Sequence, residues 1–280
     1  MKKLGAQPGD YQDEETFTLQ SHQDENLSIE ESTERIAQHF ASISQQYPPL
    51  NHELLPASVK TKLANVTEEE VPILTEEEVW KKIIQSKKPK SADVPKRIVQ
   101  EFSPELTTPV TKIFQNIARS GHWPKAWRVE FGTALQKLAN PITEDQLRII
   151  SLTPFFSKVF ERFVVSWLLH YVGSQMEWGQ FGGLKGSSIS HYLIHFVNYI
   201  LFNQDLNIPH AVLAVMIDFS KAFNRINHNV VITIYREIGV PGWLLKIVIG
   251  FLTDREMILR YKGGQSGKKS FPGVAPKAHC

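Results

Sequence analysis

The chain has 280 residues, of which 42% are hydrophobic and 21% charged, an ordinary composition for a globular protein. A chain of this length can bury a substantial core in one large domain or two small ones. Its single cysteine, Cys280, excludes an internal disulfide and favours a reducing, intracellular compartment. No signal segment opens the chain, and its apolar runs are too short to predict a membrane span.

The formal net charge of +2 conceals an asymmetry along the sequence. Residues 1–80 contain 16 acidic and 5 basic residues, whereas residues 81–280 contain 13 acidic and 26 basic residues. Residues 81–280 therefore carry a formal net charge of +13. A positive charge of this size favours binding to a nucleic-acid backbone, because each neutralised phosphate releases counterions. A solvated basic face without a ligand is the alternative.

The N-terminal part is expected to be disordered and then helical. Residues 1–28 are polar, acidic and poor in aromatic side chains, which predicts disorder. The apolar spacing over residues 27–47 predicts a helix capped by Ser28. A second helix is predicted to begin after Thr75, which forms a capping-box pattern with Glu78.

Three longer helices are predicted in the middle of the chain. Residues 106–120 are amphipathic and are followed by Gly121, a typical helix terminator. Residues 157–172 and 188–203 have the same character. Helices that alternate with a few strands indicate an α+β fold.

The most informative segment is AVLAVMIDFSKAFNRINHN, residues 211–229. Seven uninterrupted apolar residues, 211–217, predict a fully buried strand that ends at Asp218. A carboxylate at the end of such a strand can hold a metal ion, although a lone Asp there more often caps a helix.

This segment resembles the first catalytic block of reverse transcriptases of the non-LTR retrotransposon type. Four further blocks resemble that family in the same order along the chain: RIISLTPFFSKVFERFV at 148–164, GQFGGLKGSS at 179–188, PGWLLKIVIGFLTDR at 241–255 and PGVAPKA at 272–278. The acidic leader, residues 1–75, lies outside the resemblance and is expected from its composition to be partly disordered and then helical. The resemblance implies reverse-transcriptase-like fingers and the first half of a palm over residues 76–280.

The resemblance also implies roles for individual residues. Asp218 would be the catalytic carboxylate and, with the backbone carbonyl of Phe219, a ligand of Mg²⁺ or Mn²⁺. Phe223 would lie beneath the nucleotide sugar, although on its own it is more readily explained as a core residue. Arg148 and Lys185 would contact the triphosphate, since both charges suit phosphate and only Arg binds it bidentately.

The last block implies that Pro276 and Lys277 position the template–nucleotide pair. The implied reaction is template-directed nucleotidyl transfer, with deoxynucleoside triphosphates added to a DNA primer on an RNA template. Two Mg²⁺ ions roughly 3.5–4 Å apart stabilise the attacking and leaving oxygens in such reactions.

The family's second catalytic block, an Asp-Asp hairpin, has no counterpart because the 280 residues contain no Asp-Asp pair. No thumb is recognised either. One carboxylate does not hold two divalent ions, so we expect a catalytically incomplete fragment. The alternatives are a nucleic-acid-binding remnant without catalysis and a decayed gene product.

Overall fold

The computed structural model describes residues 17–67, 70–85, 94–184, 186–205 and 211–271. It has a mixed α/β architecture, in agreement with the α+β expectation. The helices run in chain order as α1 (Gln20–Asp24), α2 (Ile29–Ser44), α3 (Ala57–Ala64), α4 (Glu76–Ile84), α5 (Lys96–Glu101), α6 (Ser103–Ser120), α7 (Phe155–Val172), α8 (Ile189–Gln204), α9 (His228–Glu237) and α10 (Gly242–Leu252). The strands are β1 (Val129–Gln136), β2 (Leu147–Leu152), β3 (Glu256–Tyr261), β4 (Gly264–Gln265) and β5 (Lys269–Ser270).

Local sequence signals account for several helix boundaries. Ser28 caps α2 as predicted, with the backbone N–H of Glu31 donating to Ser28 Oγ at 3.1 Å, and the predicted capping box of α4 forms, with Glu78 N–H donating to Thr75 Oγ1 at 3.3 Å. Helix α6 ends at Gly121, whose φ of 73° is a left-handed conformation that glycine adopts without strain. The helices predicted from the sequence are observed as α2, α4, α6, α7 and α8, and these predictions are confirmed.

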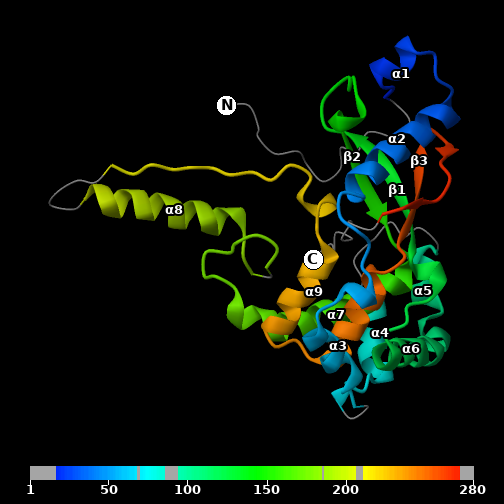
Figure 1. Ribbon diagram of the computed structural model, residues 1–280, viewed down its shortest axis with the longest axis vertical. Coiled ribbons are helices and arrows are strands. Elements are labelled where there is room, and N and C mark those ends of the chain that lie inside the picture. The colour runs from blue at the N-terminus through cyan, green and yellow to red at the C-terminus, as the bar shows by residue number, and fades with distance from the viewer. Residues whose placement is uncertain (1–16, 68–69, 86–93, 185, 206–210, 272–280) are drawn as a thin grey trace.

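The strands form one mixed sheet in the order β2-β1-β3-β4, with β5 also pairing with β3. The β1–β2 pair is antiparallel and the β1–β3 pair is parallel. Because parallel neighbours cannot be joined by a tight hairpin, the chain between β1 and β3 includes β2 and helices α7 to α10. In Figure 1, α2 crosses one face of this sheet.

Two separate hydrophobic cores stabilise the structure. The smaller one lies between α2 and the sheet and includes Ile36, Phe40, Met257 and Tyr261. The larger one lies among the helices and includes Phe114, Phe160 and Leu244. Figure 1 shows the helical layer below the sheet and α8 projecting away from it.

Two expectations are wrong for the described residues. Residues 17–28 are structured rather than disordered, because Leu19 and His22 are buried and His22 pairs with Glu144 at 3.0 Å. Residues 211–217 are not a buried strand: they are largely exposed and belong to no strand of the described sheet. A strand needs a hydrogen-bonding neighbour, and apolar composition alone does not supply one.

Among the described residues, no helix combines the length and apolar character needed to cross a membrane.

Candidate functional site

Asp218 lies in an extended, exposed segment that leads into a short 3-10 turn at Ala222–Asn224. The adjacent Phe219 is 77% exposed. Lys221 in this segment adopts a left-handed φ of 54° and forms an ion pair with Asp145. The Lys221 ammonium lowers the pKa of the Asp145 carboxyl.

This ion pair brings two of the predicted site segments near each other. Asp145 precedes Arg148 by three residues, and Lys221 follows Asp218 by three residues. Arg148 itself is exposed on β2, where it lies opposite Leu135 of β1. The structure thus links the segment that follows Asp218 to the start of β2.

The structure does not describe the remaining predicted site residues. Lys185, Pro276 and Lys277 lie outside the described residues, and so does the side chain of Phe223. Their proposed roles remain predictions. The block at 179–188 is joined to α8 by ring contacts, with Phe181 5.7 Å from Tyr192 between centroids.

The carboxylate environment of Asp218 does not fit a two-ion metal site. Within the described ranges, no group of three or more His, Cys, Asp or Glu side chains is placed to hold a metal ion. The acids of the β1–β2 connection already have partners: Glu144 pairs with His22 and Arg35, each at 3.0 Å, and Asp145 pairs with Lys221.

A pair of basic side chains on α4 and α7 was not identified from the sequence. Arg162 Nη1 lies 3.5 Å from the backbone carbonyl oxygen of Lys82, and the Lys82 ammonium lies 4.6 Å from the ring centroid of Phe163. Burial lowers the pKa of Lys82, and the Arg162 charge lowers it further. Neither cation forms an ion pair with an acidic side chain in the part of the chain that is described. Two neighbouring cations of this kind are suited to binding an anion.

A buried ion pair, Arg255 with Glu130, lies between the sheet and the helices. Arg255 donates from Nε to Oε1 of Glu130 at 2.9 Å, and both side chains are buried. The guanidinium also lies 4.6 Å from the ring centroid of Phe251. The sequence gives one signal for this group: Glu130 is the single acidic residue in an otherwise uncharged strand.

The comparison with curated proteins agrees with the motif analysis. The chain is 26% identical over 246 residues to an RNA-directed DNA polymerase from the mobile element jockey of Drosophila melanogaster. The match includes 84% of this chain but 26% of that protein, so the chain spans about a quarter of the length of its relative. No family model matches the sequence. The comparison supports a distant relation between this chain and the RNA-directed DNA polymerases of non-LTR retroelements.

Proposed function

We propose that the chain is a nucleic-acid-binding part of a retroelement RNA-directed DNA polymerase, and that it does not extend a primer by itself. The observation that carries the proposal is the match to the jockey polymerase along most of the chain, together with five motif blocks in order. The positive balance of residues 81–280 supports phosphate binding.

The proposed lack of catalysis rests on the surroundings of Asp218. Mg²⁺ prefers carboxylate, phosphate and water oxygens, and nucleotidyl transfer with two ions needs several protein carboxylates. Among the described residues, Asp218 belongs to no group of three or more side chains that could hold a metal ion. The ligands would be RNA template and DNA primer, and completion of the site would require carboxylates from outside the described residues.

The test uses the purified 280-residue chain and a labelled DNA primer annealed to an RNA template. We expect fluorescence anisotropy to show binding that weakens steeply with salt, because released counterions drive the association. We expect no extension when deoxynucleoside triphosphates and Mg²⁺ or Mn²⁺ are added. Extension would overturn the catalytic part of the proposal, and absent or salt-independent binding would favour a decayed gene product.

The basic pair on α4 and α7 gives a sharper version of this test. Substituting Lys82→Gln together with Arg162→Gln should reduce the slope of log affinity against log salt by about 1–2, if both contact phosphates. Lys81→Gln is the matched control, because Lys81 is already paired with Glu77 on the same helix. An equal loss in the control would indicate a general charge effect rather than a phosphate contact.

A further inference from the structure

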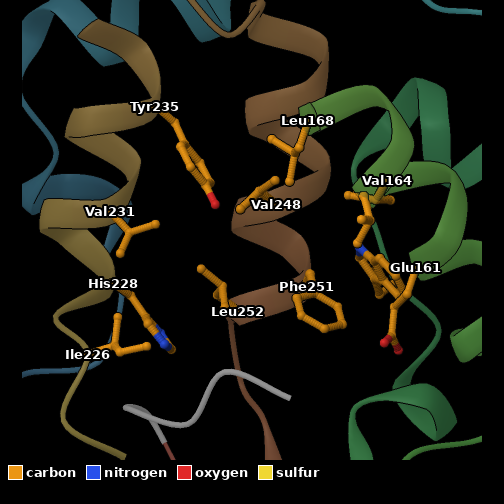
Figure 2. Close-up of a pocket in the computed structure, with 12 residues that line it drawn as sticks. Glu161, Val164, Leu168, Ile226, His228, Val231, Tyr235, Val248, Phe251 and Leu252 are labelled. Atoms are coloured by element: carbon orange, nitrogen blue, oxygen red, sulfur yellow. The ribbon is translucent and has the colours of Figure 1, made fainter. Parts of the chain in front are cut away.

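The mainly apolar pocket between α7, α9 and α10 is poorly suited to a phosphate group. It measures about 250 Å³, and its wall is largely aliphatic and aromatic (Figure 2). His228 in this wall is 2% exposed, and both of its ring nitrogens are buried without a hydrogen-bond partner among the described residues. Burial lowers the pKa of His228 to about 4, so the ring is neutral at pH 7. The neighbouring Arg255 is already paired with Glu130, so a phosphate ligand needs cations from another part of the molecule.

The face of the sheet opposite α2 carries two arginines, Arg148 of β2 and Arg260 of β3. Side chains alternate between the two faces along a strand, and residues opposite each other in the register share a face. Leu259 belongs to the core between α2 and the sheet, which places Arg260 on the other face. Arg260 lies opposite Thr133 of β1, and Arg148 lies opposite Leu135 on the same strand, so the two arginines share that face.

This face is partly open to solvent and positively charged. Arg148 is exposed, and several apolar side chains of the face are only partly buried: Phe131, Ile150, Leu152 and Ile258. Glu256 lies on the same face of β3 but is paired with Lys268 at 3.3 Å, and Asp145, three residues before Arg148, is paired with Lys221. Within the described part of the chain, neither arginine forms an ion pair. Their charges are therefore available to an anionic ligand.

Arg260 is held in position by an aromatic ring. Its Cζ lies 3.7 Å from the ring centroid of Phe131, a cation–π contact that orients the guanidinium. Its Nε is buried, whereas the terminal nitrogens Nη1 and Nη2 stay accessible and make no hydrogen bond within the described structure. A guanidinium that is already oriented and has free terminal donors is suited to bidentate binding of phosphate.

We propose that Arg148 and Arg260 bind the phosphate backbone of one nucleic-acid strand that crosses this face of the sheet. The inference rests on the proposed nucleic-acid binding of the chain and assigns residues to it. The two arginines stand two strands apart across the sheet and two residues apart along it, which separates their Cα atoms by roughly 12 Å. The Arg260 guanidinium leans over Phe131 and therefore away from Leu135 and Arg148, so the two charges fit different phosphates of an extended strand better than a single phosphate group.

The experiment measures how salt affects the affinity of the full chain for a fluorescent DNA primer annealed to an RNA template. Fluorescence anisotropy gives the dissociation constant at a series of salt concentrations. We expect Arg148→Gln and Arg260→Gln each to reduce the magnitude of the slope of log affinity against log salt by about 1, and the double variant to reduce it by about 2. Arg260→Lys retains the charge and should restore the wild-type slope, which a purely structural role of Arg260 would not predict.

Arg119→Gln is the matched control, because it removes the same charge from an exposed position on α6 and should leave the slope unchanged. Arg148 is exposed, so Arg148→Gln tests the inference even if Arg260→Gln does not fold. The inference is overturned if the wild-type chain binds with a steep slope that neither glutamine variant changes more than the control does. It is also overturned if the variants weaken binding of a deoxynucleoside triphosphate with Mg²⁺ and leave the primer–template slope unchanged. Absence of primer–template binding by the wild-type chain would overturn the proposed function, and this inference with it.

Discussion

At the scale of single residues, Glu130 and Arg255 form the most deeply buried ion pair of the described structure. Both side chains are almost completely buried, and Arg255 also donates to the backbone carbonyl of Phe251 at 3.3 Å. Removing one member of a buried pair leaves an uncompensated charge, whereas an exposed pair contributes little. Mutations in the buried pair and in an exposed pair should therefore lower the free energy of unfolding by different amounts.

Glu130→Ala should lower the free energy of unfolding by about 3–5 kcal/mol in urea denaturation, because Arg255 is left buried without a counter-charge. Glu25→Ala is the control, since the Glu25–Arg35 pair is exposed and should contribute less than about 1 kcal/mol. Equal effects of the two substitutions would contradict the buried placement of Glu130.

His228 predicts a pH dependence of stability. Its folded pKa of about 4 lies below the unfolded value of 6.5, so between these pH values the unfolded chain binds more protons than the folded one. Stability should therefore fall by about 2 kcal/mol as the pH is lowered from 6.5 to 4. Urea denaturation of the wild type and of His228→Leu across this range measures the difference.

The contribution of Glu161 has the opposite sign, because its raised folded pKa makes the folded state bind more protons in its own titration range. That contribution is present in both proteins and cancels in the comparison. If wild type and His228→Leu show the same pH dependence, the imidazole is not buried in its neutral form.

At the scale of elements, the segment 211–219 and α8 are unusual because both are apolar and exposed. No residue of α8 is buried, and α8 contains no Asp, Glu, Lys or Arg. Val215 is 74% exposed and Leu213 is 88% exposed. Exposed apolar surface of this extent favours association and aggregation. The sequence pattern showed that the segment is apolar, but the buried strand predicted from it is wrong, because no neighbouring strand among the described residues pairs with it.

Substitution by lysine can show whether this segment is exposed or buried. Leu213→Lys combined with Val215→Lys should change the free energy of unfolding by less than about 0.5 kcal/mol and should raise solubility, because both positions face solvent. Leu244→Lys is the buried control and should unfold the protein or destabilise it severely. A loss of several kcal/mol in the double variant would indicate that the segment is buried after all.

At the scale of the whole molecule, the acidic leader is packed on the body through α2. Ile36 and Phe40 of α2 share a core with Met257 and Tyr261 of β3, more than 200 residues later in the sequence. The Tyr261 hydroxyl also donates to the backbone carbonyl of Phe17 at 2.9 Å. The division at residue 75 remains a proposal about organisation, and these contacts predict that leader and sheet unfold together.

Ile36→Ala should destabilise the protein by about 2–5 kcal/mol in a single cooperative transition, because it creates a cavity in the core that joins α2 to the sheet. Ile29→Ala is the control on the same helix, where the side chain is 44% exposed, and it should have a much smaller effect. Two separate transitions would show instead that the leader is an independent unit.

Local signals in the sequence determined the ends of several helices. The capping boxes at Ser28 and Thr75 and the terminator Gly121 act through neighbours a few residues away, so they could be recognised without tertiary information. The motif order similarly identified the distant relation to retroelement polymerases.

Other features depend on contacts between residues far apart in the chain, and those were decided by the tertiary structure. Burial of Leu19 and His22, the Glu130–Arg255 pair and the pocket around His228 all require such contacts. The same holds for the segment 211–217, because a β-strand is stabilised by its hydrogen-bonding neighbours and not by its own sequence. The sequence alone therefore determined the helix ends and the family resemblance, while the fold decided which side chains are buried, paired or left facing solvent.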